Sequence, residues 1–554
     1  MAKTVAVIAP MVDVTQYHLD LALRLKTSNR ELTLATLQEL MQNGFRYERL
    51  PAVPSKRDMM PAAGFYLTGL LREQGYQTVT TYQCSDTELK RLADADPFAI
   101  CLSTTMILST DSLKQIVLDI RRHMPDIPLI AGGIFVWKSY QFLAFHQDQP
   151  DNTGDSNPLL FSIPATDIPA DVFVVSPHGR KPLLEILTVL SQGKKSDLTH
   201  IPNLALPQPD GTCHFTNRYD ELVNYDRDFT RWDLLDDLPE QVPVRTSVGC
   251  PFRCRYCDFY QLYPQIFIRS KESLMAELSM IRQRAGGKPF ILHPTDDNVF
   301  INARRVHEVT EAFIESGIKQ WIGFMRASSV NEENIETIRR SGLLISLLGI
   351  ESGDKGQLRR MNKSQNLETA RRGIEILDRN GITALMTFIV GYPGETSETI
   401  NQTAQFLNDL DIGLASSSYL LFPLIISPFS DLARREFRDQ WHIKGYVDRW
   451  SHYTMNSDET TDYGYELFKQ VTRVPYHYTE ERTHQNRVLF DDDQRRQLFR
   501  LRQQLTIAFL EQASWKNIQG ILTEMARVMR LVAQDIPDEF QHEVLFDRNM
   551  IRQT

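Results

Sequence analysis

Three cysteines, Cys250, Cys254 and Cys257, stand at the spacing C-x3-C-x2-C within the segment CPFRCRYC. Thiolates at this spacing can converge on one small inorganic centre. Four thiolates would complete an iron–sulfur cluster or a zinc site, whereas three leave one metal position open for chemistry. A zinc site completed by a histidine is the alternative, but neither a second C-x2-C pair nor a nearby histidine pair supports it.

The composition is that of an ordinary globular protein large enough for about three domains. No run of 18 apolar residues predicts a membrane span, and the net charge of −9 argues against a general nucleic-acid binder. The other cysteines, Cys84, Cys101 and Cys213, are scattered rather than arranged as a disulfide framework. This usage suits a reducing compartment, so we expect a cytoplasmic protein.

Strands and helices alternate over residues 1–200, which predicts a doubly wound, Rossmann-like parallel sheet. Small residues gather where the predicted strands end, and ligands of such sheets bind beyond those ends. Small side chains there would let a large flat ligand approach the backbone, although tight turns alone would also explain them. These residues are Ser103, Thr104, Thr105, Gly132, Gly133, Ser176 and Gly179. The predicted strands are Val5–Ile8, Tyr76–Tyr82, Phe98–Ser103, Pro128–Ala131 and Val172–Val175.

Residues 201–242 form a predicted linker with a small hairpin, and alternation returns over 243–430. Six strand–helix units with polar strand ends predict a partial (β/α)6 barrel with its active site at the C-terminal mouth. Residues 431–554 are expected to be mostly helical, with an aromatic segment that either packs on the barrel or covers a substrate. The predicted barrel strands are Val244–Val248, Phe290–Leu292, Trp321–Phe324, Leu344–Ile350, Ala384–Val390 and Leu420–Ile426.

The cysteine motif, GIESGDKGQLRRMNK from Gly349 and FIVGYPGET from Phe388 together resemble the radical S-adenosylmethionine (SAM) enzymes. The resemblance implies that the three cysteines hold a [4Fe–4S] cluster and that SAM binds its open iron. Tyr256 fits the aromatic position before the last cysteine. The implied SAM contacts are Glu351 or Ser352 for the ribose, Gly391 for the adenine, Arg326 for the carboxylate, and Asp296 or Asp297 for the amino group. A surface ion pair is the alternative for Arg326, and a helix N-cap for either aspartate.

Three N-terminal segments, CLSTTMILST, LIAGGIFVW and VVSPHGRKPLLEIL, resemble the cobalamin-binding domain that precedes the radical SAM domain in many of these enzymes. The resemblance implies that the small residues at the strand ends contact cobalamin. The third segment departs from the usual Gly-Glu-Gly-Glu turn. No Asp-x-His-x-x-Gly motif occurs, so a histidine ligand below cobalt is not expected. His178 is the one histidine expected near the pocket rim, as a solvated loop residue.

These resemblances imply a cobalamin-dependent radical SAM methyltransferase acting on an unactivated carbon of a small-molecule or natural-product substrate. Cyclisation, rearrangement or oxidation with the same cofactors is one alternative, and a cobalamin or redox sensor without turnover is another. A tRNA methylthiotransferase would need a second cysteine triad, which the scattered cysteines do not supply. The expected partners are the substrate and an electron donor such as flavodoxin or ferredoxin, with neither a membrane nor a nucleic acid. Nothing in the sequence identifies the substrate.

Overall fold

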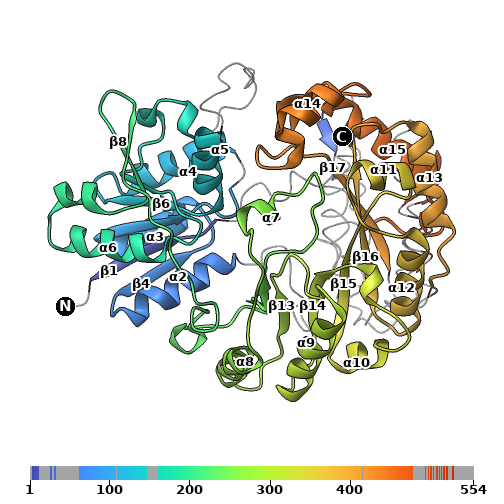
Figure 1. Ribbon diagram of the computed structural model, residues 1–554, viewed down its shortest axis with the longest axis horizontal. Helices are drawn as coiled ribbons and strands as arrows, with labels where there is room; N and C mark the ends of the chain where they lie inside the picture. The colour runs from blue at the N-terminus through green and yellow to red at the C-terminus, as the bar shows by residue number, and fades with distance from the viewer. Residues whose placement is uncertain are drawn as a thin grey trace.

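Two sheets joined by a connecting segment organise the chain in the computed structural model (Figure 1). In Figure 1 the N-terminal sheet, blue to green, lies on the left, and the barrel, green to orange, lies on the right. The predicted helices beyond residue 480 fall mostly outside the residues that the structure describes. Those are 3–10, 61–107, 109–145, 160–413 and 417–477, the short strands at 25–27 and 30–32, and single residues between 493 and 528.

The N-terminal sheet has seven strands. They are β1 (Thr4–Ile8), β4 (Gln77–Thr81), β5 (Ala99–Ser103), β6 (Leu129–Gly132), β7 (Val172–Val174), β8 (Leu204–Pro207) and β9 (Cys213–Phe215). Their order is β4-β1-β5-β6-β7-β8-β9, and the first five run parallel. That order belongs to the flavodoxin-like doubly wound sheets, which confirms the predicted fold class. A separate antiparallel pair is formed by β2 (Leu25–Thr27) and β3 (Arg30–Leu32).

Helices cover both faces of this sheet. They are α2 (Ala62–Glu73), α3 (Asp86–Asp94), α4 (Thr110–His123), α5 (Ile134–Phe145) and α6 (Arg180–Ser191). Val5 and Val7 belong to the core beneath α2 and α6, whereas Ala6 and Ile8 belong to the core beneath α3, α4 and α5. Side chains alternate between the faces of a strand, so a strand buried on both faces must be apolar throughout.

The predicted hairpin of the linker exists, but it continues the N-terminal sheet. Strand β8 pairs antiparallel with β7 through Phe173↔Ala205 and Val174↔Leu204, and β9 pairs with β8. The sheet therefore runs to Phe215, beyond the boundary expected at residue 200, and its last two strands are antiparallel. The hairpin covers the edge of β7, which would otherwise present unpaired backbone groups.

The barrel consists of six parallel strands in sequential order. They are β10 (Gln241–Val244), β13 (Ile291–Pro294), β14 (Trp321–Met325), β15 (Leu343–Glu351), β16 (Thr383–Val390) and β17 (Ser418–Pro423). The outer helices are α8 (Lys271–Ala285), α9 (Ala303–Glu315), α10 (Ile335–Arg340), α11 (Lys355–Arg360), α12 (Leu367–Arg379) and α13 (Ser397–Asn408). The partial barrel was predicted, and its polar strand ends meet at one mouth.

The first barrel strand differs from its prediction. The expected strand Val244–Val248 breaks after Val244, and Ser247–Val248 becomes β11, which pairs antiparallel with β12 (Phe267–Ile268). The short helix α7 (Phe259–Leu262) lies between them. The break has a physical cause, because the Asp296 carboxylate accepts hydrogen bonds from the Thr246 backbone and hydroxyl.

The aromatic segment after the barrel packs against it. Trp441, Tyr446 and Trp450 are buried in one core with Tyr392. Of the two alternatives, this burial supports packing against the barrel rather than a substrate-covering lid. The elements here are α14 (Arg435–Trp441), β18 (Lys444–Tyr446), β19 (Arg449–Ser451) and α15 (Thr460–Gln470). None of the helices among the described residues combines the length and hydropathy that a membrane crossing requires.

Contacts between the two sheets pass through the connecting segment. Trp232 is fully buried in the barrel core, and its ring lies 5.5 Å from that of Phe65 in α2. Its indole N–H donates to Glu277 on α8 at 2.9 Å. Glu277 also forms a buried ion pair with Arg269, and both side chains are 2% exposed.

This ion pair makes the interface sensitive to removal of one partner. Arg269→Met leaves the Glu277 carboxylate buried without a cation, so we expect it to lower the free energy of unfolding by about 3–5 kcal/mol. The double variant R269M/E277Q removes both charges and keeps an acceptor for Trp232, so it should recover most of that loss. Urea unfolding of the two variants measures the difference; equal losses would contradict the assigned ion pair.

Candidate active site

The three cysteines lie in one loop, residues 249–258, called the cysteine loop below. Cys254 is buried, Cys250 and Cys257 are half-buried, and all three are free thiols. Burial raises the pKa of the Cys250 thiol, and it raises the pKa of Cys257 to about 12, with Cys254 adding to both. Three thiols held together in one loop form a donor set suited to iron, which binds them as thiolates.

The cysteine loop is hydrogen-bonded to the segment GIESGDKGQLRRMNK from Gly349, called the fourth-strand motif below because it begins in β15, the fourth barrel strand. The Arg255 backbone N–H donates to the Met361 carbonyl at 2.9 Å, and the Asn362 side chain donates to the Arg253 carbonyl at 2.6 Å. Within the described residues, no three histidine, cysteine or acidic side chains have an arrangement that could hold a single metal ion.

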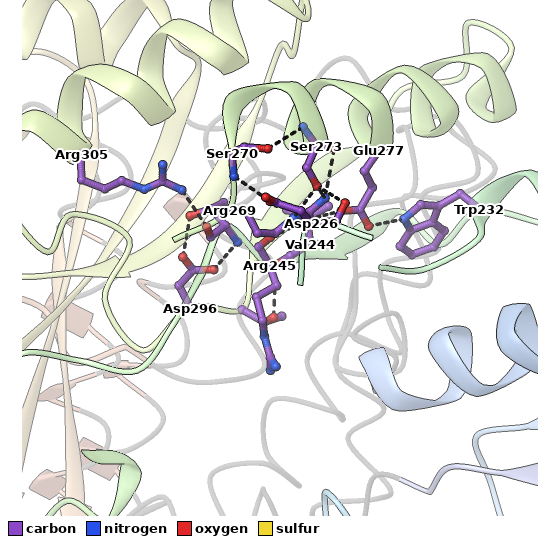
Figure 2. A network of polar contacts seen from close by, with 12 residues as sticks. Asp226, Trp232, Val244, Arg245, Arg269, Ser270, Ser273, Glu277, Asp296 and Arg305 are labelled. Atoms are coloured by element: carbon purple, nitrogen blue, oxygen red, sulfur yellow. Dashed lines mark hydrogen bonds and ion pairs between the residues drawn. The ribbon is translucent and has the colours of Figure 1, made fainter. Parts of the chain in front are cut away.

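Asp296 anchors the start of the cysteine loop rather than facing a ligand. Its carboxylate accepts hydrogen bonds from the Thr246 backbone at 2.7 Å and from the Thr246 and Ser247 hydroxyls at 2.6 Å each. Arg305 reinforces this turn by donating to the Thr246 carbonyl at 2.7 Å (Figure 2). Asp296 thus holds the turn with both of its oxygens, and its contact with the SAM amino group stays a prediction.

Asp297 is the better candidate of the two aspartates for binding the SAM amino group. Burial raises the pKa of its carboxyl to about 6, and its charge in turn raises the pKa values of Cys250 and Cys257. Its carboxyl therefore lies near the cysteine loop. An amino group bound beside the cluster would find its acceptor here.

Glu351 forms a buried triad with Tyr256 and Lys363. The Tyr256 hydroxyl donates to Glu351 Oε1 at 3.0 Å, and Lys363 Nζ contacts the same oxygen at 3.0 Å. The side chains of Lys363 and Glu351 are 7% and 10% exposed. The φ angle of Glu351 is +70°, in the left-handed region, which turns the chain as β15 ends. Sequence analysis named Tyr256 and Glu351 separately and did not identify Lys363.

Two further predicted SAM contacts are covered by protein. The Ser352 hydroxyl accepts from the Asp354 backbone at 3.1 Å and faces Thr403 of α13, so Glu351 is the better ribose candidate. The Gly391 carbonyl accepts from His452 at 2.9 Å if that ring nitrogen carries the proton. A Cβ on Gly391 would lie 2.5 Å from Thr460 and 2.9 Å from Trp450. The aromatic segment therefore packs over the Gly391 turn, where only glycine fits.

Arg326 is buried at the end of β14, so the surface ion pair considered for it is wrong. Its guanidinium lies 4.0 Å from the ring centre of Phe252 in the cysteine loop and donates to the Ser364 carbonyl. It also lowers the pKa of Cys250, opposing the larger effect of burial. A buried cation beside the cysteine loop suits a carboxylate ligand, as predicted from the resemblance.

A cavity of about 450 Å³ lies between the carboxyl ends of β5, β6 and β7 and the inner face of β10 and β13. The predicted small residues that line it are Ser103, Thr105, Gly132, Gly133, Ser176 and Gly179. Thr104 does not line the cavity, so the expectation that it contacts cobalamin is corrected. Its side chain is fully buried and donates to the Gly132 carbonyl at 3.1 Å, which ties two of these loops together.

The barrel wall of the cavity carries polar residues that sequence analysis missed. Gln241, Arg245 and His293 line it, together with the predicted rim residue His178. His178 lies 5.9 Å from Tyr225, ring to ring, and is largely buried rather than solvated. Alternation along "ILHPT" placed His293 opposite the apolar Leu292 and was the available signal.

The two halves also meet at the cysteine loop itself. Lys138 on α5 forms an ion pair with Asp258 at 2.6 Å, immediately after Cys257, and Asp258 accepts from the Ser427 hydroxyl at 2.7 Å. The Asp258 side chain is 9% exposed. A residue of the N-terminal domain therefore fixes the far end of the cysteine loop.

Comparison with known proteins agrees with this arrangement. Residues 244–407 match the radical SAM superfamily, so they form a radical SAM domain, which uses a [4Fe–4S] cluster and SAM. Over 393 residues the chain is 25% identical to the anaerobic magnesium-protoporphyrin IX monomethyl ester cyclase of Rubrivivax gelatinosus, covering 67% of this chain and 65% of that protein. The chain thus matches slightly less than two thirds of this relative's length.

Two solved structures show a similar fold. The radical SAM methyltransferase TsrM of Kitasatospora setae has a TM-score of 0.51 and 15% identity, covering 79% of this chain and 76% of TsrM. The cobalamin-dependent SAM radical enzyme OxsB has a TM-score of 0.51 and 14% identity, covering 100% of this chain and 75% of OxsB. Residues 244–407 of the chain are therefore a radical SAM domain. The chain has the fold of the cobalamin-dependent members.

The neighbouring aspartates should behave differently when each is replaced. Asp296→Asn loses an acceptor that holds two residues of the turn, so we expect a stability loss of about 2 kcal/mol. Asp297→Asn keeps the turn, so it should unfold like the wild type but bind SAM at least 10-fold more weakly. Thermal unfolding and equilibrium dialysis of reconstituted protein with SAM test this pair, and a D296N variant as stable as D297N would contradict the assignment.

Proposed function

We propose that this protein is a cobalamin-dependent radical SAM methyltransferase acting on an unactivated carbon of a small molecule. The carrying observation is the cavity, which joins the strand ends of the N-terminal sheet to the barrel wall at β10 and β13. A ligand held at those strand ends would face a substrate lying between it and SAM. When bound, the cluster and SAM supply a substrate radical, and cobalamin supplies a methyl group.

The chain's own residues position the reacting groups. The Cys250, Cys254 and Cys257 thiolates would hold the cluster, and the buried Arg326 and the half-buried Asp297 offer opposite charges to the carboxylate and amino group of SAM. The Glu351 triad fixes the ribose side. The small loops at the ends of β5, β6 and β7 offer backbone surface to cobalamin. Burial of this site excludes water, which would otherwise quench reactive intermediates.

A second candidate is an oxidative cyclisation with the same cofactors. The Rubrivivax gelatinosus relative is a cyclase and aligns with 67% of this chain. The methyltransferase is preferred because TsrM, whose fold is similar over 79% of this chain, is a methyltransferase. In either case an electron donor such as flavodoxin or ferredoxin would supply the reducing electron.

Replacing any one cysteine of the loop tests the cluster assignment. With C250A, C254A or C257A we expect complete loss of SAM cleavage to 5′-deoxyadenosine, because each thiolate binds a separate iron. C213A is the matched control, since Cys213 lies in β9, away from the loop, and should leave cleavage unchanged. The measurement is product analysis after anaerobic reconstitution with SAM and a reductant. Retained cleavage in a loop variant would falsify the assignment.

Product counting separates methylation from cyclisation. A methyltransferase of this kind consumes a second SAM to restore the methyl donor, so S-adenosylhomocysteine should accumulate with 5′-deoxyadenosine in about equal amounts during turnover. A cyclase should form 5′-deoxyadenosine without S-adenosylhomocysteine. Chromatography of quenched reactions quantifies both products, and the second pattern would replace the proposed methyl transfer with cyclisation.

A further inference from the structure

Gln241 carries a buried polar atom whose partner is missing. The residue begins β10 and lines the cavity, and its side-chain oxygen Oε1 is buried without a hydrogen-bond partner. Leaving such an acceptor unpaired costs about 1–3 kcal/mol, which is why buried polar groups nearly always have partners. A donor inside the cavity would satisfy it.

His293 supports the same conclusion from the next strand. It faces the cavity from β13, where Pro243 of β10 is its paired neighbour. Among the residues that the structure describes, none shares a hydrogen bond with its ring, and burial alone lowers its pKa to about 4. The ring is therefore neutral and presents one donor and one acceptor.

Strand alternation explains why these groups share one wall. Gln241 and Pro243 line the cavity from β10, whereas Val242 belongs to the barrel's hydrophobic core and Val244, at the strand end, contacts both. On β13, His293 faces the cavity and Leu292 faces the core. The cavity-facing side of these two neighbouring strands is thus polar but uncharged at Gln241 and His293.

We propose that Gln241 and His293 form the barrel's half of the cobalamin site, and that Gln241 Oε1 accepts a hydrogen bond from a side-chain amide of the corrin ring. This inference rests on the cobalamin binding proposed above. The corrin rim carries several primary amides, which are neutral N–H donors. A buried acceptor without a partner suits such a donor.

Size supports contact with both walls. Pockets for drug-sized ligands measure about 300–1,000 Å³, and cobalamin is larger than such ligands. A ligand of that size exceeds the cavity of about 450 Å³, so it would contact both the strand ends of the N-terminal sheet and the wall of β10 and β13. The neighbouring Arg245 also lines the cavity, and its side chain extends away from the network of Arg269 and Asp296 (Figure 2).

Equilibrium dialysis of the full-length protein with hydroxocobalamin tests the proposal. Gln241→Leu removes the acceptor, so we expect the Kd to rise about 10-fold, equivalent to one lost hydrogen bond. Gln241→Met provides a second, unbranched replacement if the leucine variant folds poorly, and thermal unfolding checks both. Gln365→Leu is the matched control, because Gln365 Oε1 is also buried without a partner but does not line the cavity. It should bind like the wild type.

A second probe, dicyanocobinamide, keeps the corrin amides but lacks the nucleotide tail. If Q241L weakens both probes similarly, the proposal is supported. Weakening of hydroxocobalamin alone would place Gln241 against the nucleotide and overturn the corrin contact. Equal binding by Q241L and wild type would overturn the inference while leaving cobalamin binding intact. Failure of the wild-type protein to bind either probe would instead refute the proposed cobalamin dependence, and this inference with it.

Discussion

One buried carboxylate, that of Asp296, determines how the first barrel strand becomes the cysteine loop. It accepts hydrogen bonds from the backbone and hydroxyl of Thr246 and from the hydroxyl of Ser247. These bonds turn the chain away from the barrel sheet just after β10 ends. A buried charge is tolerable only when its lone pairs are satisfied, and here the turn itself supplies the donors. The position of the three thiols relative to the barrel mouth follows from this turn.

The cysteine loop is then fixed from three further directions. Lys363 and Glu351 hold Tyr256 from the fourth-strand motif, Arg326 stacks on Phe252, and Lys138 reaches across from the N-terminal domain to Asp258. Each contact joins an element distant in sequence to a residue within or just after the motif. The loop is therefore held by both domains, and the cavity between those domains is a consequence of the same contacts.

The strands and their order were predictable because their chemistry is local. The apolar run Val5–Ile8 and the glycine-containing turn after β16 identify elements from their own residues. Side-chain pairing across the fold was not predictable. Nothing near Asp296 in the sequence indicates that its partners lie 50 residues earlier. The next residue, Asp297, is also an aspartate, so residue type does not tell the two apart. Likewise, Thr104 differs from its neighbours only in facing Gly132, a contact that the folded loops create.

The hairpin β8–β9 has a practical consequence for dividing the protein. Cutting the chain near residue 200 would remove both antiparallel strands and expose the backbone of β7, whose partners are Ala205 and Leu204. An uncovered flat strand edge invites pairing between chains and hence aggregation. A fragment meant to represent the isolated N-terminal half would need to extend through Phe215. Insolubility of a shorter fragment would then reflect where the chain was cut, not an inability of this half to fold.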